Sequence, residues 1–176
     1  MSSTASNEAG SRFNFVPLTF EDLPFLVEIR NECREFLHDN RAFNLEDSQK
    51  WFRVQQPDFW MIYHREVPIG YFRTSNHCRR NRTIVAGADL HRDFRGKGLG
   101  FLAWVAFLDT LFPLYDLYSV SLELLASNVR AFHLYQKLGF VVEGKRRGAV
   151  LRNGERIDSI LMSILSSEWS SRVADI

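Results

Sequence analysis

The chain has 176 residues, of which 45% are hydrophobic and 24% are charged. This composition is typical of a soluble globular protein, and the length predicts one domain with a substantial core. The formal net charge is only +1, which argues against nucleic acid as a partner. The longest apolar run, Leu99 to Leu108, is shorter than the roughly 20 residues that span a bilayer, so no membrane partner is expected.

The two cysteines, Cys33 and Cys78, form no C-x-x-C motif and no disulfide framework. A reduced, cytoplasmic location is therefore expected. Residues 1–11 are polar and small and contain no apolar core of a secretory signal. We expect them to form a disordered tail before a single domain at 12–176.

The first half of the chain predicts a strand, two helices and a hairpin. Residues 12–18 alternate polar and apolar side chains and meet Pro17, which indicates a short strand. Thr19 is a candidate N-cap for a helix whose apolar stripe reaches Cys33. A second helix is expected from about Leu45. Three further segments follow: a β-hairpin at 59–64 and 67–73, a basic loop at 76–81, and a central strand at about 82–90.

The second half continues with alternating helices and strands. The segment from Gly98 to Phe112 is apolar nearly all round, which predicts a buried helix that ends near Pro113. The remaining elements are a buried strand at 117–125, a helix from Ser127 or Asn128 to Gly139, a strand from Phe140, and a return strand at 157–165 after the Asn153-Gly154 turn. These elements predict a mixed α/β domain.

The stretch from Leu90 to Gly100 is a candidate anion site. It lies between the central strand and the apolar helix, and it is rich in glycine and basic residues. The first turn of a helix has unpaired backbone N–H groups and a partial positive charge, and glycines allow an anion to approach the backbone. Seven Lys or Arg residues lie between Arg73 and Lys97, against two acids. A mobile loop with solvated charges is the alternative.

The loop fits neither the G-x-G-x-x-G nor the Walker A motif. Its R-x-x-G-x-G pattern (Arg95, Gly98, Gly100) resembles the acyl-CoA pyrophosphate loop of the GNAT N-acetyltransferases. The segment from Ala126 to Phe140 is similar to their S-N-x-x-A-x-x-L-Y-x-K-x-G-F motif. Residues 29–31 and 47–52 resemble the branch that contains ribosomal-protein N-terminal and nucleotide-sugar amine acetyltransferases.

This resemblance implies a central, mostly antiparallel sheet of about seven strands and about four helices, with splayed central strands that form a CoA cleft. The implied cofactor is acetyl-CoA. The implied cofactor-binding residues are the strand positions Ala88, Asp89 and Leu90, the loop residues Arg95, Gly96, Lys97, Gly98, Leu99 and Gly100, and Asn128 and Tyr135 on the following helix. Asn128 could instead be only an N-cap.

The implied reaction moves an acetyl group to a primary amine by direct attack. It needs a neutral amine, stabilisation of an oxyanion and protonation of the leaving sulfur. The motif position makes Tyr135 the candidate general acid, although a tyrosine there could belong only to the core. The base is open. Many relatives carry a Glu on the central strand, where this chain has Val85 and Ala86. Asp89 and Glu123 are the nearby carboxylates, Glu123 could be purely structural, and a water chain is a further possibility.

The resemblance also suggests acceptor-binding residues: Arg30, Asn31, Trp60, Tyr71 and the hairpin from Lys145–Arg147 to Asn153. The acceptor is expected to be a peptide N-terminus or a small amine, and the chain a monomer or homodimer. Two alternatives stay open: a CoA-binding regulatory module without turnover, and an acetyltransferase specific for nucleotide-sugars or polyamines.

Overall fold

The structure, a computed structural model, describes residues 13–174. The predicted tail at 1–11 lies outside the described residues. The strands are β1 (Phe13–Pro17), β2 (Phe59–His64), β3 (Val67–Cys78), β4 (Thr83–Leu90), β5 (Ser119–Leu125), β6 (Val141–Arg152) and β7 (Glu155–Leu165). The α-helices are α1 (Leu23–Glu32), α2 (Leu45–Gln55), α3 (Leu99–Leu114), α4 (Val129–Leu138) and α5 (Ser166–Ala174).

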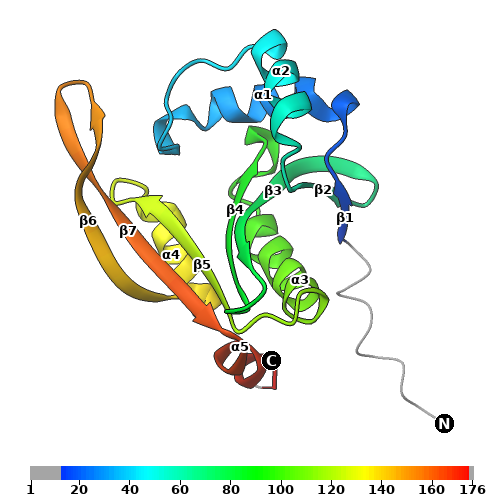
Figure 1. Cartoon of the computed structure of the whole chain (residues 1–176), viewed down its shortest axis with the longest axis vertical. Coiled ribbons are helices and arrows are strands. Elements are labelled where there is room, and N and C mark those ends of the chain that lie inside the picture. Colours follow the sequence, from blue (N-terminus) through cyan, green and yellow to red (C-terminus); the bar gives the residue numbers. More distant parts are fainter. Residues whose placement is uncertain (1–12, 175–176) are drawn as a thin grey trace.

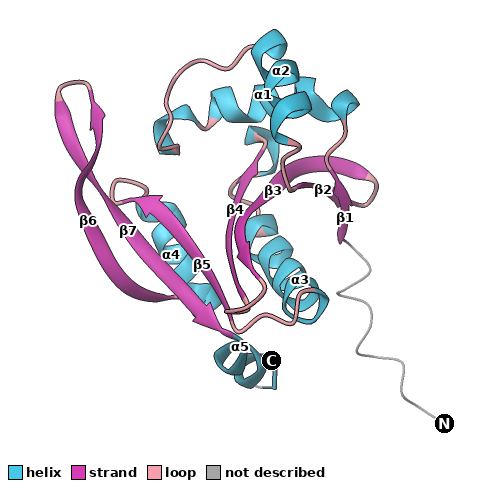
Figure 2. Cartoon of the chain, viewed as in Figure 1, coloured by secondary structure: helices cyan, strands magenta, loops and turns pink. Residues whose placement is uncertain are grey.

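All seven strands belong to one sheet with the order β1-β2-β3-β4-β5-β7-β6 (Figures 1 and 2). Every neighbouring pair is antiparallel except β4 and β5, which are parallel. These two strands pair only over Thr83–Val85 and Ser119–Ser121. Beyond Val85 they diverge, and the sheet opens into two halves (Figure 1). The α/β class and the splayed central strands expected from the sequence are confirmed.

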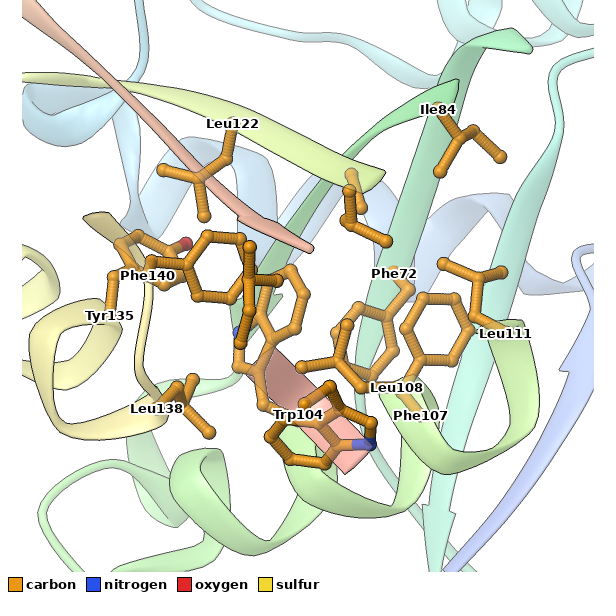
Figure 3. Close-up of a cluster of buried hydrophobic side chains, with 14 of the residues drawn as sticks. Phe72, Ile84, Trp104, Phe107, Leu108, Leu111, Leu122, Tyr135, Leu138 and Phe140 are labelled. Carbon is orange, nitrogen blue, oxygen red and sulfur yellow. The ribbon is translucent and has the colours of Figure 1, made fainter. Parts of the chain in front are cut away.

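Two clusters of buried side chains cover the two faces of the sheet. On the α3 and α4 face, Trp104 and Phe107 pack against Phe72 of β3, and the rings of Phe72 and Phe107 stack with centroids 3.8 Å apart (Figure 3). On the α1 and α2 face, Leu26 and Tyr71 belong to a second cluster. Because alternate side chains of a strand point to opposite faces, neighbouring residues of β2 and β3 enter different clusters.

Local signals placed most elements correctly, and tertiary contacts account for the differences. β3 continues to Cys78, where a basic loop was expected, because its outer end still pairs with Thr83 of β4. α3 is less buried than predicted, since Leu102 is 50% exposed. The sequence did not predict α5, whose Trp169 side chain packs on the α3 side of the core and donates to Asp109 Oδ1 at 2.9 Å.

Within residues 13–174, no helix has both the length and the apolar character needed to cross a membrane. Cys33 and Cys78 are free thiols.

Candidate active site

The glycine-rich loop leads into the amino end of α3. Gly96 and Gly98 both have a φ of +77°, a left-handed conformation that glycine adopts without strain. The first helical hydrogen bond of α3 is the one that the N–H of Leu102 donates to the carbonyl of Gly98, at 3.3 Å. Among the described residues, no acceptor meets the N–H groups of Leu99, Gly100 and Phe101. These donors, together with the helix dipole, are suited to an anion, as the predicted site requires.

The Arg95 side chain turns back from this loop toward α1. Its Nε donates to the carbonyl of Leu90 at 2.8 Å, and its Nη2 lies 3.0 Å from Glu32 Oε2 and 3.1 Å from Cys33 Sγ. Lys97, by contrast, is exposed. The geometry therefore gives Arg95 a bracing contact with α1 and leaves Lys97 as the exposed cation of the loop.

Glu32 is the carboxylate that holds this region together. Its side chain is only 6% exposed, and it accepts from Arg92 and Arg95. Burial favours the neutral acid, but hydrogen bonds from Arg92 and the nearby charges of His91 and Arg92 outweigh it and lower the pKa of Glu32. An ionised Glu32 therefore fixes the start of the loop to the end of α1.

The end of β4 has one free side. Ala88, Asp89 and Leu90 pair with β3 but lie beyond the part of β4 that pairs with β5. The Asp89 carboxylate points to the α1 face, where its Oδ2 accepts from Tyr71 OH at 2.7 Å and from Arg73 Nη1 at 2.5 Å. This oxygen, predicted as part of a candidate base, is thus occupied by two donors.

Tyr135 lies on α4, against the other side of the opening. Its ring makes edge-on contacts with Trp104 and Phe140 (Figure 3). Burial raises the pKa of Tyr135 to about 12, with smaller opposing effects from Arg73 and Asp89. The hydroxyl makes no hydrogen bond to another described residue, so it remains a protonated donor at neutral pH.

Asn128 caps α4. Its side-chain oxygen accepts from the N–H of Ala131 at 3.1 Å, and α4 ends at Gly139 with a φ of +95°. The choice between Ser127 and Asn128 as the cap is therefore decided for Asn128. This cap fixes the amino end of α4, the helix that carries Tyr135.

Glu123 of β5 has two cationic or titratable neighbours. Arg146 Nη1 lies 3.2 Å from Glu123 Oε2, and His38 Nε2 lies 3.5 Å from Glu123 Oε1. His38 Nε2 also lies 2.7 Å from Ser159 Oγ on β7. The sequence did not single out His38, because a lone histidine in an irregular connection has no pattern that marks it as functional.

Three of the four predicted acceptor residues lie on the α1 side. Arg30 stacks over the ring of Phe43, with its guanidinium carbon 4.1 Å from the centroid. Asn31 clamps the backbone of Phe43, donating to its carbonyl at 2.8 Å and accepting from its N–H at 2.9 Å. Tyr71 is buried and bonds to Asp89. Asn31 thus fixes the backbone of Phe43, whose ring lies beneath the Arg30 guanidinium.

Trp60 is the exception, because it lies on the opposite face of the sheet from the other three, and an acceptor role for it stays a prediction. It packs with the α3-side cluster and lines a pocket between β1 and α3 with Phe15 and Phe107. Strand alternation is the reason: Met61 pairs with Tyr71 on the α1 side, so Trp60 points to the opposite face.

The predicted basic hairpin is tied to the rest of the site. Lys145 pairs with Asp158 at 2.7 Å, and Arg146 pairs with Glu123. From the far end of β6, Arg152 donates to the carbonyls of Glu35 and Leu37, which follow α1. The hairpin therefore contacts the α1 side across the opening of the sheet.

Comparison with known proteins places this geometry in a family. Residues 12–141 match the model of the acetyltransferase (GNAT) domain. The chain is 32% identical over 155 residues to a spermidine N(1)-acetyltransferase of Vibrio cholerae, which covers 87% of this chain and 79% of the relative. A spermidine N(1)-acetyltransferase of Escherichia coli K12 is 34% identical over 77 residues, which is 44% of this chain and 41% of that enzyme. The match therefore spans less than half the length of the E. coli relative.

The fold comparison agrees. A crystal structure of spermidine N-acetyltransferase from Vibrio cholerae in complex with CoA and spermine superposes with a TM-score of 0.83. The superposition covers 91% of this chain and 99% of that structure, at 20% sequence identity. From the family model, which matches most of the chain, and from the shared fold, we conclude that the chain belongs to the GNAT acetyltransferase family.

Proposed function

We propose that this protein transfers the acetyl group of acetyl-CoA to a primary amine. The observation that carries this proposal is the position of the unpaired N–H groups at the start of α3, next to the end of β4 and to α4. A Cβ at Gly100 would lie 3.5 Å from Leu90 Cδ1 of β4 and 3.9 Å from Leu134 Cδ2 of α4, the helix that carries Tyr135. When bound, acetyl-CoA supplies the thioester carbonyl that an amine attacks and the thiolate that leaves.

The residues of the site fit that cofactor. The unpaired N–H groups of Leu99, Gly100 and Phe101 suit a pyrophosphate, and the exposed Lys97 adds a full charge. The edge of β4 at Ala88–Leu90 that does not pair with β5 offers backbone groups to the amide-containing pantetheine arm, apart from the Leu90 carbonyl that accepts from Arg95. Asn128, at the amino end of α4, is also predicted to contact the cofactor. Arg95 contributes by bracing the loop.

Tyr135 is proposed to give its proton to the leaving sulfur. A general acid has to hold its proton until the leaving group needs it. Burial keeps the phenol neutral, with a pKa of about 12, and no described side chain competes for the hydroxyl. The tyrosine is thus available as a donor at neutral pH.

The acceptor proposed here carries one amine and is a small molecule or a peptide N-terminus. Four arginines, Arg30, Arg73, Arg146 and Arg152, lie around Asp89, Glu123 and His38. The two carboxylates are already paired with Arg73 and Arg146. Because Arg30 and Arg152 have no carboxylate partner within residues 13–174, the local field disfavours a polycation. A polyamine is nonetheless the second candidate, since the named relatives are spermidine acetyltransferases.

Two measurements test the proposal. Acetyl-CoA should raise the melting temperature in proportion to the logarithm of its concentration, and no shift at millimolar ligand would refute the CoA site. A screen that detects free CoA thiol should then compare single amines, short peptides with free N-termini, spermidine and spermine. Stabilisation by CoA without turnover on any amine would favour the regulatory module. The monomeric or dimeric state, the cytoplasmic location and the absence of a nucleic-acid partner stay predictions.

A further inference from the structure

His38 lies where the two halves of the sheet face each other. It follows η3 (Arg34–Phe36), which continues from α1 on the β1–β4 half. Its ring, however, contacts Ser159 of β7 and Glu123 of β5, which belong to the other half. Arg152 of β6 holds the preceding residues by the carbonyls of Glu35 and Leu37. The segment from Glu35 to His38 therefore bridges the opening above the divergent strands, near the end of α1 in Figure 1.

The two nitrogens of this imidazole have different surroundings. Nε2 lies 2.7 Å from Ser159 Oγ and 3.5 Å from Glu123 Oε1. Nδ1 makes no hydrogen bond to a described residue, and the side chain is 40% exposed. A proton on Nε2 is directed to Ser159 and Glu123, which leaves the lone pair of Nδ1 free. This resembles a base whose second nitrogen is oriented by a hydrogen-bond partner, here the Ser159 hydroxyl with the Glu123 carboxylate close by.

Resting on the proposed function, we propose that His38 is the general base that removes the proton from the acceptor amine, with Glu123 and Ser159 as its positioning residues. Nδ1 of His38 takes one proton from the ammonium form, which produces the neutral amine. A second proton leaves the nitrogen of the acceptor amine as the C–N bond forms and the C–S bond breaks. Tyr135 gives one proton to the sulfur and is restored by that second proton, while His38 releases its own to solvent. The sum is one amide, one thiol and one proton.

The charges around His38 favour its neutral form. Burial lowers the pKa of His38, Glu123 of β5 opposes this, and Arg73 of β3 and Arg152 of β6 lower the pKa further. Arg146 of β6 also pairs with the same glutamate and weakens its effect. The net pKa lies below the ordinary value, so at neutral pH the ring is able to accept a proton.

Both predicted carboxylates are already paired with an arginine. The Oδ2 of Asp89 already accepts from Tyr71 and Arg73, and Glu123 is shared between Arg146 and His38. Among these three titratable groups, His38 alone combines the lack of an arginine ion pair with a position between the two halves of the sheet.

The test compares His38→Gln and His38→Ala with the wild type, and uses His133→Ala as the matched control. His133 is an exposed histidine of α4 that contacts Gln136. Glutamine is able to keep the hydrogen bond to the fully buried Ser159 but does not take a proton at neutral pH. With the best acceptor of the screen, kcat/KM of His38→Gln should fall about 100-fold at pH 7. The deficit should shrink as the pH approaches the pKa of the acceptor amine, because the amine then loses its proton without a base. Added imidazole should partly restore the activity of His38→Ala.

A second variant tests the positioning role. Because Glu123 raises the pKa of His38, Glu123→Gln should move the acidic limb of the kcat/KM profile to lower pH. A purely structural glutamate would change the rate without moving that limb.

The inference is overturned if His38→Gln retains wild-type kcat/KM, or if its deficit is the same at every pH. Failure of the proposed function is distinguishable from failure of the base assignment, because in the first case the wild-type protein binds CoA but acetylates no amine. That outcome overturns both.

Discussion

The guanidinium of Arg73 lies directly across the backbone of Gly87 on the neighbouring strand. The two residues are paired in the β3–β4 register, and a Cβ at position 87 would come within 2.9 Å of Arg73 Cζ and Nη2. The absence of a side chain at Gly87 lets Arg73 reach Asp89, two residues further along β4. Arg73 in turn acts on the pKa of both His38 and Tyr135. One glycine thus sets the position of the charge between the proposed base and the proposed acid.

Gly87→Ala should therefore reduce activity more than stability. The clash falls on the end of a flexible side chain, so Arg73 is expected to move and lose its ion pair with Asp89 while the strands stay paired. We expect a loss of about 1–3 kcal/mol in the free energy of unfolding, together with a clear drop in kcat. Urea unfolding and steady-state kinetics measure both. Gly144→Ala is the control, because nothing lies within 4 Å of a Cβ there.

Tyr135→Phe should lower kcat by about 100-fold, the usual contribution of a general acid. The dissociation constant for CoA and the melting temperature should change little, because the ring keeps its contacts with Trp104 and Phe140. Steady-state kinetics and calorimetric titration of CoA measure the two effects. Tyr118→Phe is the control, at a tyrosine that is 53% exposed. An unchanged kcat would remove the acid assignment.

Gly98→Ala should weaken CoA binding and destabilise the loop. Nothing lies within 4 Å of a Cβ at this position, so the cost arises from the φ of +77° and not from a clash. It should be about 1–2 kcal/mol. Gly98→Asn should be milder, because asparagine tolerates the left-handed region. If alanine and asparagine were equally harmful in CoA titrations and thermal melts, backbone conformation would not be the cause.

Glu32→Gln should raise KM for acetyl-CoA several-fold and leave kcat nearly unchanged. The substitution removes the charge that Arg92 and Arg95 share, and with it the anchor of the loop to α1. It leaves a partly buried Arg95 without its counter-charge. Glu21→Gln, an exposed acid in the first turn of a short helix, should behave as wild type. A fall in kcat at unchanged KM would contradict the anchoring role.

Cys33 should make the folded state less stable at high pH. Burial, reinforced by the charge of Asp89, raises the pKa of its thiol to about 12. In the unfolded chain this thiol has a pKa of about 8.5. Between these two values the unfolded state binds fewer protons than the folded state, so stability falls as the pH rises. Cys33→Ala should flatten that slope in urea titrations from pH 8 upward, and Cys78→Ala should leave it unchanged.

Helix caps and turn residues explain why so many elements were predicted correctly. Asn128 caps α4, Gly139 ends it at a φ of +95°, and Asn153-Gly154 forms the turn between β6 and β7 with φ values of +51° and +84°. Each of these signals depends on the conformational preferences of residues only a few positions apart. The glycine loop and the Asn128–Phe140 segment belong to the same class, and they were enough to indicate the family and its cofactor.

The acceptor side depends on contacts between distant residues. His38 meets Ser159 across 121 positions, and Arg73 meets Asp89 across 16. The alternation of β2 shows that Trp60 and Met61 face opposite ways, but only the packed sheet decides that Trp60 belongs to the α3 side. The sequence by itself therefore determined most of the elements, the family and the candidate CoA loop, because those signals are local. The tertiary structure decided which charges converge on the proposed acceptor site, because that convergence depends on the register and divergence of β4 and β5.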